Sequence, residues 1–214
     1  GAVRFVRVNL CLPVQASFTA VDDCANDRFS VQVNVTSYGS GSTANLAYTV
    51  DGNPFNLSNL PLGITTIGPF ANTAEVSCTL THEISNCGSA QATIYSNCPI
   101  TIPCGSTVEM SHCYRNNDTR TFHFISSSPF ETVTLSFVSG TMDPNDVIRG
   151  YSGSDNSGTP IVELTGSFAN LGSPQVAGTS LGNELFLEID SDGSNSCATG
   201  QQSSWNFEVE CTPG

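Results

Sequence analysis

The sequence predicts an all-β protein built as two tandem antiparallel β-sandwiches. Short runs in which apolar and polar residues alternate recur along the whole chain, and this period of two is the signature of half-buried strands. Gly, Pro and Asn separate the runs at intervals of about ten residues, as in sandwich domains. No stretch repeats with helical spacing.

The first sandwich is predicted to occupy residues 1–101. Its clearest strand is 29–35, where three valines alternate with polar residues. Further strands are predicted at 46–50, 64–67, 75–82 and 92–95. The Asp51-Gly52 dipeptide favours a hairpin turn after the second of these runs. Residues 1–15 are typical either of a first strand or of the tail of a preceding domain, and the sequence leaves both alternatives open.

The second sandwich is predicted to occupy residues 102–214, after a linker or shared edge at 100–104 with Pro99 and Pro103 beside it. Its strands are predicted at 108–110, 121–125, 132–137, 147–151, 161–164, 185–190 and 205–209. Trp205 alternates with Phe207 and Val209, so its side chain is predicted to lie in the core.

The charge of the chain excludes several partners. The sequence has 6 Arg and Lys residues against 19 Asp and Glu, a net charge of −13, and all six basic residues are Arg. Such a surface repels nucleic acids and anionic membranes, so neither is expected as a partner. Without Lys there is no P-loop lysine and no Schiff base. The sequence shows no signal peptide and no apolar run long enough to insert into a membrane, and its abrupt start is typical of a mature or excised piece of a longer protein.

Nine cysteines in a chain rich in Ser, Thr and Gly indicate a secreted or cell-surface protein with disulfides. Cys78 shares a strand face with Val76 and Leu80 and is predicted to be the free thiol. Cys197 and Cys211 are predicted to pair. The other predicted disulfide cysteines of the second half are Cys104 and Cys113. In the first half, the three possible pairings of four cysteines stay open: Cys11, Cys24, Cys87 and Cys98.

The second half resembles a CUB domain over residues of about 104–211. The segments that carry the resemblance are VTLSF, NDVIRGYSGSDNSG, LGNELFLEIDSDGS and WNFEVEC, in that order. Asp146 falls on the Asp of the family's Tyr-Asp motif, and Ser191-Asp192 falls on its Ser-Asp motif. The Tyr is replaced by Asn145, and the acidic residue that normally precedes the motif is absent, with Asp143 as its nearest replacement. The resemblance implies a jelly-roll sandwich.

The first half is similar in style to the immunoglobulin-like and fibronectin-type-III-like modules that occur in large secreted bacterial surface proteins and secreted peptidases. The segments that carry this similarity are VNVTSYGSGSTANLAYTVDG and ITTIGPF. Together the two resemblances imply a multidomain extracellular protein.

A calcium site is predicted in the loops of the second half. Calcium takes six to eight oxygen ligands from carboxylates, amides, carbonyls and water. The predicted ligands are Asp146, Asp190 and Asp192, with Asp143 and Asn195. The resemblance implies that the ion orders the loops and leaves acidic oxygens that receive a basic side chain.

The predicted function is therefore that of a non-catalytic extracellular binding or adhesion module, which contacts a protein with basic side chains or a glycan. The alternative is a carbohydrate-binding or targeting region of a secreted enzyme such as a metallopeptidase or glycoside hydrolase. Tyr114 and Tyr151 are the predicted surface aromatics for a ligand. Enzymatic activity is not expected, because no nucleophile is paired with a base and no zinc motif is complete.

Overall fold

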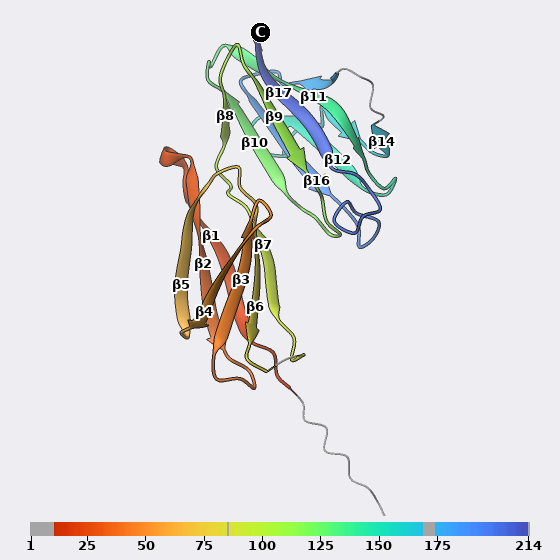
Figure 1. The fold of residues 1–214 in the computed structure, drawn as a ribbon. Coiled ribbons are helices and arrows are strands. Elements are labelled where there is room, and N and C mark those ends of the chain that lie inside the picture. The colour runs from red at the N-terminus through yellow and green to blue at the C-terminus, as the bar shows by residue number, and fades with distance from the viewer. Residues whose placement is uncertain (1–10, 85, 169–173, 214) are drawn as a thin grey trace, which may run out of the picture. The chain divides into compact units, whose positions relative to one another are not determined.

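A computed structural model describes residues 11–84, 86–168 and 174–213, and it confirms the all-β class (Figure 1). The chain divides into two compact units, Gly1–Cys98 and Pro99–Gly214. The predicted first-strand alternative for residues 1–15 falls partly on residues 1–10, which lie outside the described residues. No helix in the described part of the chain has the length and hydropathy needed to cross a membrane.

The first unit is a sandwich of a three-stranded and a four-stranded sheet, with strand orders β1-β2-β5 and β4-β3-β6-β7. One short 3-10 turn, η1 (Cys24–Asn26), follows the first strand. The strands are β1 (Gln15–Asp23), β2 (Arg28–Ser37), β3 (Ala44–Val50), β4 (Asn53–Leu60), β5 (Gly63–Ala71), β6 (Val76–His82) and β7 (Ala90–Ile94).

Alternation of apolar and polar residues explains why these segments form strands around one core. Val31, Val33 and Val35 of β2 are all buried, while the residues between them are partly exposed. Leu46 and Leu80 are buried on the opposite sheet. The strands that the sequence did not predict, β1 and β4, both lie at sheet edges and carry few buried residues.

The second unit contains two five-stranded sheets. One has the order β13-β12-β16-β10-β8, and the other has the order β14-β11-β17-β9 with β15 also paired to β11. The strands are β8 (Ile100–Ile102), β9 (Thr107–His112), β10 (Thr121–Ser126), β11 (Glu131–Thr141), β12 (Val147–Ser152), β13 (Val162–Leu164), β14 (Ser167–Phe168), β15 (Gln175–Thr179), β16 (Glu184–Asp190) and β17 (Trp205–Pro213). The segment expected to be a linker or shared edge is thus β8, an edge strand that pairs in parallel with β10.

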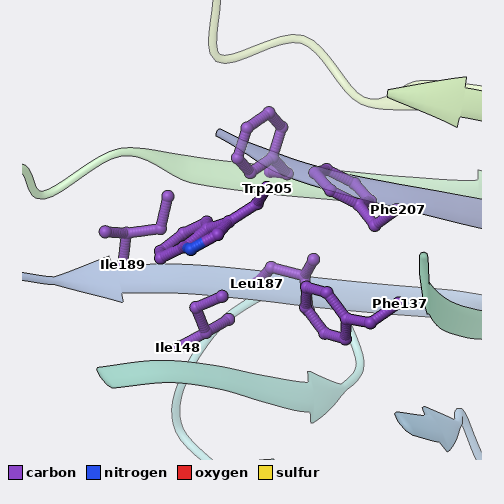
Figure 2. Close-up of a pocket in the computed structure, with 7 residues that line it drawn as sticks. Phe137, Ile148, Leu187, Ile189, Trp205 and Phe207 are labelled. Carbon is purple, nitrogen blue, oxygen red and sulfur yellow. The ribbon is translucent and has the colours of Figure 1, made fainter. Parts of the chain in front are cut away.

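Trp205 lies in the core of the second unit, as predicted. Its indole is almost fully buried and stacks on Tyr114 with ring centroids 4.8 Å apart. The indole N–H donates to the carbonyl of Thr141 at 3.2 Å, so the one polar atom of the ring is satisfied. Figure 2 shows the apolar side chains that surround a small void beside this ring, including Phe207 and Leu187.

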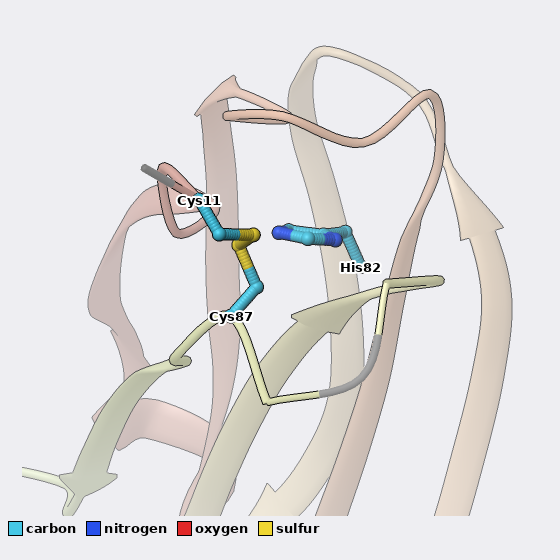
Figure 3. A group of neighbouring side chains, drawn as sticks. All are labelled: Cys11, His82 and Cys87. Atoms are coloured by element: carbon cyan, nitrogen blue, oxygen red, sulfur yellow. A yellow bond between two sulfur atoms is a disulfide. The ribbon is translucent and has the colours of Figure 1, made fainter. Parts of the chain in front are cut away.

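Four disulfides join the described cysteines, and one pairing prediction is wrong. In the first unit the pairs are Cys11–Cys87, beside the ring of His82 (Figure 3), and Cys24–Cys98. In the second unit they are Cys104–Cys211 and Cys113–Cys197. The predicted Cys197–Cys211 bond does not form, because Cys211 lies toward the far end of β17, whereas Cys197 lies in the loop before the start of that strand at Trp205. Cys78 is free and buried, as predicted.

Non-reducing peptide mapping should therefore recover the four pairs above. Burial raises the pKa of Cys78 to about 11, so its thiolate is scarce at neutral pH and alkylation should require unfolding. Recovery of a peptide that links Cys197 to Cys211, or rapid alkylation of Cys78 in the folded protein, would contradict this arrangement.

Glu83 provides a pH-dependent contribution to the stability of the first unit. Its carboxylate accepts hydrogen bonds from the backbone N–H and hydroxyl groups of Ser42 and Thr43, at 2.6–3.1 Å. The hydrogen bond from its own backbone N–H has the largest effect and those from Ser42 the next largest, and together they lower the pKa of Glu83 to about 2. A depressed carboxyl pKa means that the stabilisation is complete above the unfolded value of 4.5 and is lost as the pH falls toward 2.

We expect Glu83→Gln to lower the melting temperature at pH 7, and the difference from wild type to shrink steadily between pH 4.5 and pH 2. Thermal unfolding of both proteins across this pH range is the measurement. Two melting curves that stay parallel down to pH 2 would show that the charge of Glu83 does not carry the effect.

Candidate cation-binding site

Loops at one end of the second sandwich bring four of the five predicted calcium residues into one hydrogen-bonded cluster. Asp143 and Asp146 lie in the segment between β11 and β12. Asp192 and Asn195 lie in the loop that follows β16. The buried Tyr114, which follows β9, underlies the cluster, since its hydroxyl accepts the backbone N–H of Asp143 at 3.0 Å.

Asp143 is buried and well supplied with donors. One carboxylate oxygen accepts the backbone N–H and the side-chain amide of Asn145, at 3.0 and 2.9 Å, and the other accepts the amide of Asn195 at 3.0 Å. These bonds, that from the Asn145 backbone foremost, hold the pKa of Asp143 below its usual value. This carboxylate is therefore ionised at neutral pH.

Asp146 is the most deeply buried acid of the cluster, with 1% of its surface exposed. Its Oδ1 accepts the backbone N–H of Asp192 at 2.7 Å. Its Oδ2 is buried and has no hydrogen-bond partner among the described residues. Burial raises the pKa of Asp146, against the opposing effects of the Asp192 N–H and the Tyr114 hydroxyl. A buried oxygen without a donor is costly unless a proton or a cation occupies the position beside it.

Asp192 lies at the rim of the cluster. It is exposed, and its Oδ1 accepts the backbone N–H and the hydroxyl of Ser194 at 2.8 and 2.9 Å. Its other carboxylate oxygen is the natural contact to solvent or to a ligand.

The structure does not bring Asp190 into the cluster. Asp190 is the last residue of β16, on the outward face of the strand, and its side chain is 65% exposed. It pairs with the Arg149 guanidinium at 3.3 Å. Because side chains alternate between the two faces of a strand, the inward position of Ile189 directs Asp190 away from Asp146.

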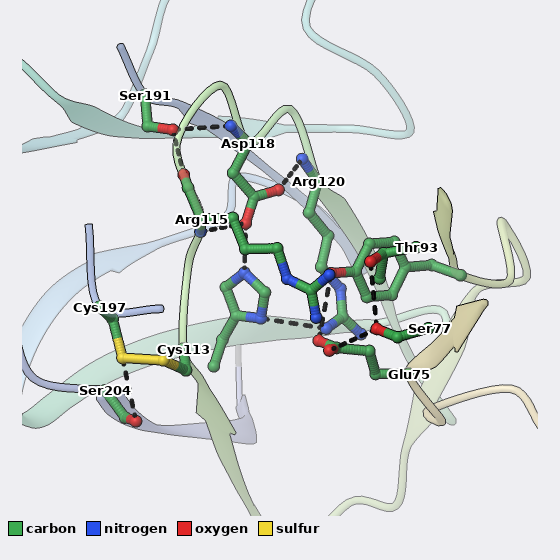
Figure 4. Close-up of polar contacts among 12 residues, drawn as sticks. Glu75, Ser77, Thr93, Cys113, Arg115, Asp118, Arg120, Ser191, Cys197 and Ser204 are labelled. Carbon is green, nitrogen blue, oxygen red and sulfur yellow. Dashed lines mark hydrogen bonds and ion pairs between the residues drawn. A yellow bond between two sulfur atoms is a disulfide. The ribbon is translucent and has the colours of Figure 1, made fainter. Parts of the chain in front are cut away.

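A turn at residues 115–118 clamps the loop that carries Asp192 (Figure 4). The Ser191 hydroxyl accepts the backbone N–H of Asp118 at 2.7 Å and donates to the carbonyl of Arg115 at 2.6 Å. The backbone N–H of Asn117 donates to the carbonyl of Asp192 at 2.7 Å. These bonds fix the backbone on both sides of the loop's first turn.

Asp118 in turn holds the clamp together. Its buried carboxylate contacts the ring Nε2 of His112 at 3.0 Å and accepts the backbone N–H groups of Arg115 and Arg120 at 3.1 and 3.0 Å. Burial acts to raise the pKa of Asp118, but the His112 contact and these N–H groups outweigh it, and the pKa lies below the usual value. Nothing in the sequence connects His112 or Asp118 to the site, because their contacts are made only in the folded chain.

Neither predicted surface tyrosine is on the surface. Tyr114 is fully buried against Trp205, and Tyr151 is 5% exposed, with its hydroxyl donating to Glu188 at 2.6 Å. The prediction that these rings form a ligand surface is therefore wrong. Tyr151 lies on the outward face of its strand, but the contact with Glu188, which also accepts the amide of Asn156, helps to cover it.

Two groups of His, Cys, Asp or Glu in the described residues have ligand atoms within 4.8 Å of one another; neither includes the acidic cluster, and both contain a disulfide. The first is Cys11, His82 and Cys87 (Figure 3), and the second is Cys104, Glu131 and Cys211. Bonded cysteines do not supply thiolates. The Nδ1 of His82 accepts the backbone N–H of Ile84 at 3.1 Å, so its Nε2 carries the proton and lies 3.2 Å from the carbonyl of Leu12. Neither ring nitrogen of His82 then has a lone pair left for a metal.

No family of known proteins matches the sequence, and no curated protein matches it significantly. Among solved structures, the chain is similar to PliG of Salmonella Typhimurium, a periplasmic inhibitor of g-type lysozyme. The similarity covers 53% of this chain and 97% of that one, with 10% identity and a TM-score of 0.29. It is too low to carry an argument about function. The four disulfides themselves indicate folding in an oxidising compartment, periplasmic or extracellular.

We expect Ser191→Ala to destabilise the second unit by about 1 kcal/mol, because it removes the acceptor at 2.7 Å from the buried N–H of Asp118 and leaves only the longer bond, at 3.3 Å, to the carbonyl of Arg115. Amide hydrogen exchange in residues 191–195 should also accelerate. Ser194→Ala is the matched control, since its hydroxyl contacts only the exposed Asp192. Equal effects of the two substitutions would show that the clamp does not hold the loop.

Proposed function

We propose that the chain is a non-catalytic extracellular binding module, in which a calcium ion orders the acidic loops of the second unit and these loops contact a protein partner through its basic side chains. The module would be secreted or displayed at a cell surface, with a CUB-like second unit and an immunoglobulin-like or fibronectin-type-III-like first unit.

The observation that carries this proposal is the buried, unpartnered Oδ2 of Asp146. An ionised carboxylate removed from water without a counter-charge costs several kcal/mol. A cation beside it removes that cost and also relieves the repulsion among Asp143, Asp146 and Asp192. The residues fit calcium, because every side chain of the cluster offers oxygen and none offers sulfur or imidazole.

The donor set also includes the backbone around Asn195. Its φ of 55° holds the loop in a left-handed turn, and its carbonyl faces the Tyr114 hydroxyl at 3.4 Å. Calcium commonly takes backbone carbonyls as well as carboxylates. Asp143, Asp146, Asp192 and the Asn195 carbonyl or amide would hold the ion, and water would complete its shell.

The expected partner is basic because the rim of the site is acidic. Asp192 is exposed above the cluster, and the net charge of the chain is −13. A partner Lys or Arg would be attracted over a distance of about 10 Å at moderate ionic strength. A glycan partner loses its support, since Tyr114 and Tyr151 are buried.

The strand arrangement of each unit is compatible with the proposed resemblance. The two five-stranded sheets of the second unit, antiparallel except for the β8–β10 pair, suit a CUB-like jelly roll. Three strands facing four in the first unit suit an immunoglobulin-like sandwich.

Thermal unfolding of wild type, Asp146→Asn and Asp190→Asn, each with calcium and with EDTA, tests the site. Calcium should stabilise wild type by about 2.7 kcal/mol at a concentration one hundred times the dissociation constant. Asp190→Asn should respond equally, and Asp146→Asn should not respond. In EDTA, Asp146→Asn should be more stable than wild type, because an amide removes the buried charge.

The proposal fails if wild type shows no calcium response. The assignment of Asp146 as the central ligand fails if wild type responds and Asp146→Asn responds as strongly.

A further inference from the structure

The edge strand β4 of the first unit has an unusual exposure. Every residue from Asn53 to Asn59 is exposed, although alternate residues of a sandwich strand normally face the core. Phe55 lies opposite Tyr48 and Leu57 lies opposite the buried Leu46, so both side chains belong to the core-facing side. They are nevertheless 46% and 37% exposed.

The sheet topology explains this exposure. β4 pairs with β3 on one side only, and its other edge is free among the described residues. The four-stranded sheet faces only three strands, so the fourth strand extends beyond its cover. Leu62 and Ile64, which follow on the turn and on β5, are exposed as well.

This edge also lacks the charged side chains that usually hinder pairing with another chain. Natural edge strands carry charged side chains, prolines or bulges that block such pairing. No charged residue occurs between Gly52 and Ala74, although the chain as a whole has a net charge of −13. Pro54 lies next to the strand's first residue, and the register shift in the pairing of β4 with β3 lies toward the other end of the strand, between Leu57 and Leu60, so the stretch between these two features is regular.

We propose that the free edge of β4 is a self-association surface, which pairs antiparallel with the same strand of a second copy of this chain. The charge distribution favours a second copy as the occupant. Two chains of −13 repel each other over most of their surfaces, and a contact through the uncharged strand β4 brings no like charges together. The two four-stranded sheets would then continue across a two-fold axis.

The sequence of β4 is complementary to itself in one register. An antiparallel pair centred on Asn56 sets Phe55 opposite Leu57 of the partner subunit, and Leu57 opposite the partner subunit's Phe55. All four side chains then lie on one face, as aromatic–aliphatic cross-strand pairs, which stabilise sheets. Pro54 lacks an N–H at each end of the ladder, which keeps the pairing short.

The association should be weak. One strand and a few apolar side chains bury less than the roughly 1,200 Å² of stable interfaces. A dissociation constant on the order of 100 µM is expected, so the dimer should be populated only at high concentration or where the chain is concentrated on a surface.

Sedimentation velocity of the full chain between about 10 µM and 1 mM tests the proposal. Wild type should dimerise, and Leu57→Arg should weaken the dimer at least about tenfold, because each dimer contains the new charge twice. Leu181→Arg is the control, since Leu181 is an apolar residue of the second unit with 87% exposure. A wild type that stays monomeric, or equal losses in both variants, would overturn the proposal.

Cysteine cross-linking tests the register independently. In the proposed pair the two Asn56 residues face each other, within the Cα distance that a disulfide spans. The two Asn53 residues lie about 20 Å apart, at about 3.3 Å per residue. Mild oxidation should therefore cross-link Asn56→Cys into a dimer and leave Asn53→Cys monomeric. Equal cross-linking of both variants, or none of Asn56→Cys, would refute the pairing.

Discussion

The burial of acidic side chains at one end of the second sandwich is the constraint on which the arrangement of its loops depends. A buried carboxylate must be neutralised by a proton, surrounded by donors, or paired with a cation. Asp118 and Asp146 lie in neighbouring loops and meet this requirement differently. Asp118 contacts His112 and accepts two backbone N–H groups, whereas Asp146 accepts one N–H and leaves an oxygen without a partner.

The difference between these two aspartates distinguishes a structural acid from the proposed ligand. The pKa of Asp118 is lowered because its donors outweigh burial, and the pKa of Asp146 is raised because burial is the largest effect on it. Both carboxylate oxygens of Asp118 have partners within the chain, and this residue holds the turn that positions Ser191. The Oδ2 of Asp146 has no hydrogen-bond donor among the described residues, and the neighbouring Asp143 and Asp192 add negative charge around it. In the proposed site, an acid with all its contacts made thus fixes the loop beside Asp146, the acid that would take the cation.

The sequence predicted strands and buried residues well where the alternation of side chains was decisive. It placed Trp205 and Cys78 in the cores because their neighbours at positions two residues away are apolar. The same alternation directs Asp190 outward, since Leu185, Leu187 and Ile189 face inward, and the acidic composition of the following loop does not change that direction. The predicted Cys197–Cys211 disulfide is wrong because it rested on proximity in sequence, whereas each of these cysteines pairs with a residue far away in the chain.

Contacts between segments that are distant in the chain could not be predicted from the sequence. The clamp joins Arg115 to Ser191, and the disulfides join Cys104 to Cys211 and Cys113 to Cys197, and each depends on which strands become neighbours. The exposure of β4 could not be predicted either, because it depends on which strands lie opposite it. Phe55 and Leu57 alternate with polar residues as in any half-buried strand, and only the strand count of the opposite sheet leaves them uncovered.

The two proposed surfaces lie on different units and differ in charge, and this separation has a physical consequence. Self-association through the neutral edge of β4 would use none of the residues that the acidic loops offer to a basic partner. A dimer would carry two cation sites, and a second binding event on a multivalent partner would then benefit from a raised effective concentration. Such avidity can exceed the affinity of one site by about 10²–10⁴ when both sites engage together. Two weak contacts, one neutral and one ionic, would therefore give firm attachment that still responds to calcium and to salt, because only one of them is electrostatic.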